Sequence, residues 1–200
     1  TFDAAYWAQT GKKLPDGESK RVVRVYRDTF RGFPTTWKAL GDRLRLMANG
    51  MVPDNLPSNP PLIWGTDFIQ GPSGLRIKYP ELRLEVVADK KRGGAKQALV
   101  YTSYSKVRGD GVKPIYGGMC LENLSQFMAR EIITEQAVEV NRRYPVLMQV
   151  HDELVVLAPV TEEAECKAFV KQVMSTPPVW WPGMKVGCEV NSSTVYGEAK

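Results

Sequence analysis

The spacing of apolar residues predicts two helices within residues 16–50. In ESKRVVRVYRDTF, Val22, Tyr26 and Phe30 recur at intervals of four, and Val23 joins the same face. Such intervals bring side chains onto one side of an α-helix. The second helix carries an apolar stripe of its own, formed by Trp37, Leu40, Leu44 and Met47. The pattern is typical of two amphipathic helices in succession.

Residues 51–63 end this pattern, and residues 64–115 replace it with one typical of strands. The stretch MVPDNLPSNPPLI holds four prolines, so it is predicted to be a loop. In LRIKYPELRLEVV and QALVYTSYSKV, apolar and polar residues alternate, while GPSG and KKRGGAK supply turn residues. We expect antiparallel strands in this part of the chain.

The longest helix is predicted over residues 118–140. Asn123, Gln126 and Arg130 lie together on one face of it, and solvent exposure alone can explain that polar strip. Another face carries an apolar stripe, formed by Leu121, Leu124, Met128 and Ile132. This face is the one expected to pack.

The last part of the chain is predicted to hold a hairpin, a helix and a strand. Val146–Val150 and Glu153–Val156 are nearly continuous apolar runs, which favours two strands of a covered sheet. Thr161 is a favourable N-cap for a helix that ends before Pro177, and residues 184–200 are expected to add a strand. Helices combined with antiparallel strands indicate an α+β fold.

Composition is that of an ordinary globular protein, with 200 residues, 43% hydrophobic and 24% charged. No apolar run approaches the roughly 20 residues that span a bilayer, so no membrane partner is expected. The first residues lack the pattern of a signal peptide. The three cysteines form no CxxC pair, which favours reduced thiols and a cytoplasmic location. We interpret them as small buried apolar residues: Cys120, Cys166 and Cys188.

A net charge of +5 permits a polyanionic partner without establishing one. Two basic segments have alternative interpretations. The loop Lys90–Gly94 is either a mobile tip or a DNA contact. The first helix is either solvated along its basic side or faces phosphates with four arginines: Arg21, Arg24, Arg27 and Arg31.

The predicted hairpin has an unusual tip, His151-Asp152-Glu153, which holds the one histidine of the chain. Tight hairpins prefer Asn-Gly or Asp-Gly, because the turn residues need positive φ. Side chains that break such a rule at an exposed apex suggest a functional site. Two adjacent carboxylates suit Mg²⁺ or Mn²⁺, although a plain polar turn also accounts for them.

Together with other segments, this tip resembles the family A DNA polymerases (the DNA polymerase I family), and the bacteriophage branch in particular. The stretch QVHDELV is similar to motif C of that family. Four more segments resemble its phage members in the same order: RVVRVYRDTFRGFPTTWKAL, GPSGLRIKYPELR, YGGMCLENLSQFMAREII and MSTPPVWWPGMKVGCEV. The resemblance implies the end of the fingers, with the helix pair and a β-hairpin insertion, in residues 1–114. It implies the motif C half of the palm in residues 115–200.

Site residues follow from this resemblance. Asp152 matches the motif C aspartate that binds catalytic Mg²⁺, and Glu153 matches its auxiliary neighbour; both are the implied catalytic residues. The implied reaction is template-directed nucleotidyl transfer by two metal ions. Its partners would be primer–template DNA and deoxynucleoside triphosphates, in the host cell cytoplasm if the protein is phage-encoded.

Four further residues match DNA-contacting positions of the family. His151 matches a residue near the primer-terminal backbone, and Gln149 matches a glutamine at the primer minor groove. Gln126 matches the palm-helix glutamine at the terminal base pair, and Asn123 is its expected companion. Amide donors suit this role, because minor-groove acceptors occupy equivalent places in every base pair.

Two parts of such a polymerase have no match in this sequence. The second essential aspartate (motif A) and the nucleotide-holding fingers helix (motif B) are absent, since TDFIQG stands in the wrong order to be motif A. An upstream portion or second subunit would have to supply them. It would cover apolar residues of the hairpin, for which Val146, Met148 and Val155 are the candidates.

Three explanations remain open: a fragment of a longer gene, one piece of a split polymerase, or a remnant without catalysis. The remnant would act as a DNA-binding or assembly module. A metal-dependent nuclease using the same carboxylates is a further alternative.

Overall fold

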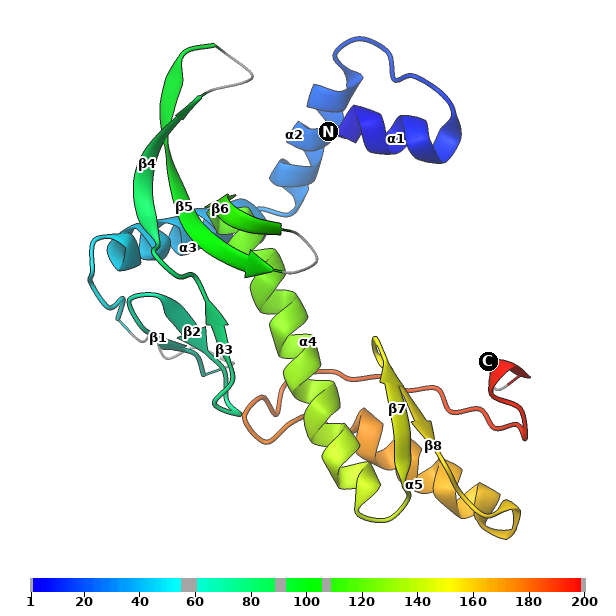
Figure 1. The fold of residues 1–200 in the computed structure, drawn as a ribbon. Helices are drawn as coiled ribbons and strands as arrows, with labels where there is room; N and C mark the ends of the chain where they lie inside the picture. Colours follow the sequence, from blue (N-terminus) through cyan, green and yellow to red (C-terminus); the bar gives the residue numbers. More distant parts are fainter. Residues whose placement is uncertain (1, 55–60, 89–92, 106–108, 199–200) are drawn as a thin grey trace.

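The computed structural model describes residues 2–54, 61–88, 93–105 and 109–198 (Figure 1). Its α-helices are α1 (Phe2–Thr10), α2 (Glu18–Thr29), α3 (Gly32–Ala48), α4 (Gly117–Asn141) and α5 (Glu163–Ser175). Its strands are β1 (Ile63–Trp64), β2 (Phe68–Gln70), β3 (Arg76–Lys78), β4 (Arg83–Ala88), β5 (Ala95–Ser105), β6 (Gly109–Ile115), β7 (Val146–Val150) and β8 (Glu153–Val156). Two 3-10 helices are Val160–Glu162 and Tyr196–Glu198.

The strands form three small antiparallel sheets, β1-β2-β3, β4-β5-β6 and β7-β8. Together with the helices they make the mixed α+β fold that the sequence predicts. Among the described helices, none is long and apolar enough to cross a membrane.

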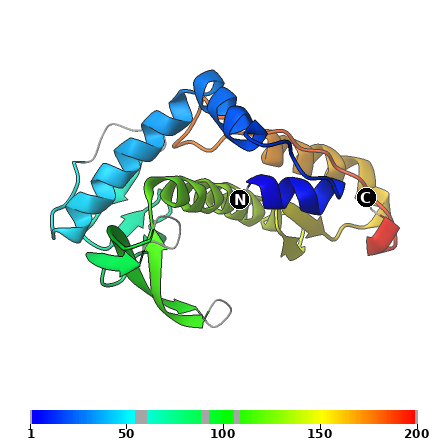
Figure 2. The same cartoon turned by 90° about the horizontal axis from the view of Figure 1, so that it is seen from above.

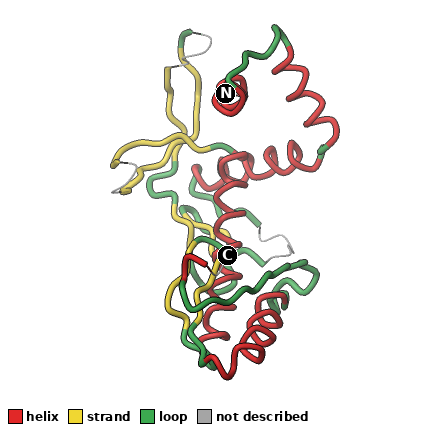
Figure 3. The backbone as a smooth tube through the Cα atoms, turned by 90° about the vertical axis from the view of Figure 1, so that its right-hand side faces the viewer, coloured by secondary structure: helices red, strands yellow, loops and turns green. Residues whose placement is uncertain are grey.

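Helix α4 runs through the centre of the molecule and contributes to both hydrophobic cores. The first two sheets lie beside its N-terminal half, and the β7-β8 hairpin and α5 lie beside its C-terminal half (Figures 1 and 3). Seen from above, α3 and α5 lie towards opposite ends of α4 (Figure 2). Leu124 of α4 belongs to the first core and Val140 to the second.

The first core joins α3 and α4 to the first two sheets. It buries the stripe of α3 that the sequence predicts, Leu40, Leu44 and Met47, with Trp37 half-buried beside it. Tyr79, only 1% exposed, enters this core from the turn between β3 and β4. The remaining buried members are Trp64, Ile69, Leu82, Leu99, Ile115, Cys120 and Leu124.

The helices α3 and α4 cross where Gly117 meets the backbone of α3. A Cβ at Gly117 would lie 1.8 Å from the Trp37 carbonyl oxygen and 2.9 Å from the Gly41 amide nitrogen. Only a glycine permits this approach, because any side chain would overlap the backbone. The contact therefore sets the position of α4 against the first core.

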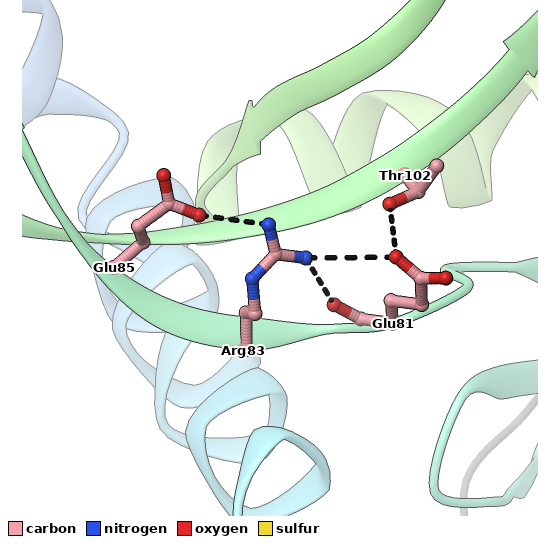
Figure 4. Close-up of polar contacts among 4 residues, drawn as sticks. All are labelled: Glu81, Arg83, Glu85 and Thr102. Carbon is pink, nitrogen blue, oxygen red and sulfur yellow. Dashed lines mark hydrogen bonds and ion pairs between the residues drawn. The ribbon is translucent and has the colours of Figure 1, made fainter.

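A network of polar side chains fixes the turn between β3 and β4 to the second sheet (Figure 4). The Arg83 guanidinium donates to the Glu81 carbonyl at 3.1 Å and to the Glu85 carboxylate at 2.8 Å. The Thr102 hydroxyl donates to Glu81 at 2.6 Å. Glu81 has φ of +55°, which is uncommon for a residue other than glycine. The network holds this turn in place across β4 and β5.

Most predicted elements are confirmed: the helix pair, the antiparallel strands, the long helix, the hairpin and the helix after it. The predicted loop at 51–63 is confirmed where it is described, although residues 55–60 lie outside the described part. The basic loop Lys90–Gly94 also lies outside it, except for its two glycines.

Three predictions for particular residues were wrong. Thr161 is not an N-cap, since a 3-10 turn precedes α5 and places Glu162 at the cap without a side-chain hydrogen bond. The described residues of the tail 184–200 contain no strand, because no neighbouring strand edge pairs with them. Cys188 is only half-buried, whereas Cys120 and Cys166 are buried as predicted.

We expect Gly117→Ala to lower the free energy of unfolding by about 3 kcal/mol or more, because the new methyl group overlaps the backbone of α3. Urea unfolding followed by circular dichroism measures the change. Gly41→Ala is the matched control, since its Cβ would meet nothing closer than 3.9 Å. That control should be neutral or stabilise by up to about 1 kcal/mol through helix propensity. Equal losses for both variants would contradict the close-contact explanation.

The cysteines should differ in reactivity. Burial raises the pKa of the Cys120 thiol to about 11, and Cys120 is 0% exposed. Thiolate is the reactive form, so a raised pKa slows alkylation. Iodoacetamide at pH 8 should modify the half-buried Cys188 first, and it should modify Cys120 only when the protein unfolds. Peptide mass mapping identifies the cysteines that have reacted. Early labelling of Cys120 in the folded protein would contradict this packing.

Candidate functional site

The β7-β8 hairpin turns at His151 and Asp152, as the sequence predicts. Val150 pairs with Glu153 and Gln149 with Leu154, so only two residues connect the strands. His151 has φ of +55°. A hairpin turn of this kind favours glycine or asparagine at positive φ, although histidine tolerates it better than most residues. Strain of this sort is often found at functional sites, which supports the interpretation of the tip as a site.

The Gln149 side chain stabilises this turn. Its Nε2 atom donates a hydrogen bond to the His151 carbonyl oxygen at 3.2 Å. Gln149 therefore has a local partner in the hairpin, and it is exposed to solvent. An incoming ligand at the tip would compete with a single hydrogen bond of ordinary length.

One face of the hairpin packs on the second core. Val146, Leu154 and Val156 contact a buried cluster formed by Val140, Tyr144, Cys166 and Val170. This packing makes the hairpin a projection from α4 and α5, and it leaves the tip in solvent. Val146 is thus already covered by this chain, so its prediction as an uncovered apolar surface was wrong.

The opposite side of the hairpin is open. A bulge between Val146 and Met148 breaks the pairing register at Leu147. Leu147 is 60% exposed and Met148 is 41% exposed. The sheet has two strands only, so both of its outer edges lack strand partners among the described residues. Unpaired edges beside exposed apolar residues suit the addition of another strand.

The side chains at the tip are all accessible. His151, Asp152 and Glu153 are exposed. Within the described part of the chain, neither carboxylate takes part in a hydrogen bond or an ion pair with another side chain. Both carboxylates are therefore free to accept hydrogen bonds or to coordinate a cation.

The described residues do not form a complete metal site. No group of three or more His, Cys, Asp or Glu side chains among them could hold a metal ion. Mg²⁺ commonly takes one or two protein carboxylates together with waters and substrate phosphates. Asp152 and Glu153 fit that partial donor set, so any further protein ligand has to come from outside these residues.

The two predicted site residues of α4 lie on the half of that helix that packs on the first core. Gln126 is exposed. Asn123 is half-buried, and its Nδ2 atom donates to the Tyr79 hydroxyl at 3.1 Å. Neither amide is hydrogen-bonded to the hairpin tip. The structure thus brings His151, Asp152, Glu153 and Gln149 together, and it places Asn123 and Gln126 on a separate element.

A buried carboxylate on α4 was not predicted. Glu131 is only 4% exposed and accepts hydrogen bonds from the Ser73 backbone N–H at 3.0 Å and the Ser73 hydroxyl at 2.6 Å. A Cβ at Gly71 would lie 2.9 Å from the same carboxylate. Glu131 therefore fixes the Gly71–Gly74 turn against α4. Its spacing from Leu124 and Met128 places it within the apolar stripe, which is the signal that could have revealed it.

Glu131→Ala should lower the free energy of unfolding by about 1–3 kcal/mol, because it removes two hydrogen bonds that Ser73 donates to a charged, buried carboxylate. Chemical denaturation measures this loss. Glu131→Gln keeps one acceptor oxygen and should cost less. Glu122→Ala, at an exposed position of the same helix, is the control and should stay within about 0.5 kcal/mol. A Glu131→Ala protein as stable as this control would contradict the proposed anchor.

Comparison with known proteins finds distant homology to part of a DNA polymerase. The chain is 28% identical over 174 residues to the DNA polymerase of Bacillus phage SP02, and the match covers 86% of this chain and 26% of that protein. No protein-family model matches the sequence, and no solved structure matches it at a significant level. The chain spans about a quarter of the length of the polymerase to which it is related.

Proposed function

We propose that this chain provides the carboxylate-bearing hairpin of a template-directed DNA polymerase. The observation that carries the proposal is the strained, exposed His151-Asp152-Glu153 tip, in a chain distantly homologous to a phage DNA polymerase. Sequence similarity to motif C of the family A polymerases assigns Asp152 and Glu153 the catalytic roles. The hairpin and the helices behind it would then be part of a palm.

Asp152 would hold Mg²⁺, with Glu153 as an auxiliary ligand. When bound, the metal ions would lower the pKa of the primer 3′-hydroxyl and stabilise the leaving pyrophosphate. The contribution of this chain is positional: the second core holds the hairpin by one face, so the Asp152 carboxylate stands in solvent within reach of a nucleotide. The second aspartate would come from an upstream portion or a second subunit.

DNA would be held by the neutral side chains around this tip. His151 and Gln149 would contact the primer strand, and the Gln149 amide would exchange its hydrogen bond to the His151 carbonyl for a minor-groove acceptor. Gln126 is exposed and free to donate in the same way, whereas Asn123 would have to leave the Tyr79 hydroxyl. Amide donors check base-pair geometry without reading sequence, which suits replication.

The unpaired edge of the hairpin is where the missing portion would add. Met148 and Leu147 expose apolar surface beside that edge. A strand carrying the second aspartate would pair there and bring its carboxylate next to Asp152. This arrangement explains why the described residues offer two adjacent carboxylates and no complete metal site.

Primer extension in Mg²⁺ tests the proposal, with this chain alone and mixed with the upstream part of the phage SP02 polymerase. Incorporation is expected only in the mixture. Asp152→Asn should reduce it by more than about 100-fold, since even residues that merely support a metal ligand cost about 10–100-fold when removed. Asp110→Asn, at another exposed aspartate, should leave the rate unchanged.

Other outcomes distinguish the alternatives. Incorporation that survives Asp152→Asn would contradict the metal assignment. An assembled complex that binds primer–template without incorporating nucleotides would favour a DNA-binding or assembly module. Degradation of a labelled primer in Mg²⁺ without nucleotides would favour a nuclease.

A further inference from the structure

A second surface, far from the hairpin in sequence, combines positive charge with exposed aromatic rings. Helix α2 stands away from the three sheets (Figure 1), and none of its residues is buried. Three cations recur along it at intervals of four and three residues, which places them on one side of the helix, and Arg31 follows in the turn between α2 and α3. We call them the basic stripe: Lys20, Arg24, Arg27 and Arg31.

The basic stripe carries little compensating negative charge. Glu18 is paired with Arg21, outside the stripe, at 2.6 Å. Within the described residues, Lys20, Arg24 and Arg27 form no ion pair; Asp28 lines the hollow over them, and Asp3 and Asp16 line a second hollow beside Lys20. A shallow hollow of about 400 Å³ lies over Lys20, Val23, Arg24 and Arg27. The stripe therefore presents several unpaired cations to any ligand in this hollow.

Aromatic rings lie next to the stripe at the corner between α2 and α3. We call Tyr26, Phe30, Phe33 and Trp37 the aromatic cluster. Neighbouring ring centres are 5.1 Å apart for Tyr26 and Phe30, and 6.3 Å apart for Phe33 and Trp37. Tyr26, Phe30 and Phe33 are 43%, 51% and 43% exposed. The aromatic part of the apolar face predicted for α2 is thus open to solvent. Exposed aromatic clusters usually mark a binding surface.

Arg27 joins the two features into one surface. Its guanidinium carbon lies 5.9 Å from the centre of the Trp37 ring, and Arg27 lines the same hollow as Lys20 and Arg24 of the basic stripe. From Lys20 to Arg27 the stripe extends about 10 Å along the axis of α2. Cations and ring faces are therefore available side by side over a length greater than one nucleotide.

We propose that this surface binds single-stranded DNA. Arginines beside exposed rings match the phosphates and the unpaired bases of a single strand, whose bases can stack on aromatic side chains. Duplex DNA is a poorer match, because its bases are already stacked and offer the aromatic cluster no free face. A polypeptide could cover the rings, but it would leave the cations of the stripe without partners. The proposal does not depend on the hairpin carboxylates, and it goes beyond the proposed catalytic role.

Fluorescence anisotropy with a fluorescein-labelled oligothymidylate tests this site on the purified chain. Arg24→Gln/Arg27→Gln should weaken binding about tenfold or more at low salt. It should also lower the slope of log affinity against log salt by about 1.4, because each lost phosphate contact removes about 0.7. Lys171→Gln/Lys185→Gln is the control, because it removes the same charge from exposed positions elsewhere. It should change the affinity and the salt slope less than Arg24→Gln/Arg27→Gln does.

Phe30→Ala should weaken binding of the same oligonucleotide about tenfold while leaving the salt slope unchanged, because it removes stacking and no charge. Phe30→Trp should retain binding. Circular dichroism checks that the variants stay folded, as expected from the exposure of these positions. The assay measures binding of an oligonucleotide by this chain alone and not nucleotide incorporation, so failure of the catalytic proposal and failure of this one are distinguishable.

Three results would overturn the proposal: no binding by the parent chain, equal losses in both double variants, or a Phe30→Ala protein that binds normally. The last result, together with loss of association with an upstream polymerase portion, would assign the aromatic cluster to a protein partner.

Discussion

The close approach of Gly117 to the α3 backbone is the constraint on which the rest of the structure depends. A glycine there allows α4 to start directly against Trp37 and Gly41, with no side chain between the helices. From that point the 25 residues of α4 extend past the first core to the second. The position of the hairpin relative to the first two sheets therefore follows from one backbone contact and the stiffness of one helix.

The same arrangement explains why the two candidate surfaces are exposed. The second core uses one face of the hairpin and leaves the tip, the bulge and both strand edges free. Helix α2 contributes nothing to either core, so its charges and rings remain in solvent. Each surface carries features that cost stability unless a ligand or partner uses them: positive φ at His151, exposed Leu147 and an open aromatic cluster.

The adjacent carboxylates of the hairpin tip and the distant homology support the same proposal. The chain is distantly homologous to 26% of a phage DNA polymerase. The described residues supply two adjacent carboxylates and an unpaired strand edge where more could be added. The proposed nucleotidyl-transfer site, assembled from two portions of polypeptide, would account for both observations.

The sequence by itself determined the elements and the tip. Apolar spacing predicted α2, α3, α4 and the strands, because periods of two and 3.6 residues are local properties. It also singled out His151, Asp152 and Glu153, since a tight turn has narrow residue preferences. Only the tertiary structure decided which apolar faces are covered. Val22 and Tyr26 have the same spacing as the buried stripe of α3, yet no residue of α2 is buried. The tertiary structure likewise decided that Glu131 is buried, because its partner Ser73 is distant in sequence. It also decided that Thr161 does not cap α5, because the preceding loop ends in a 3-10 turn.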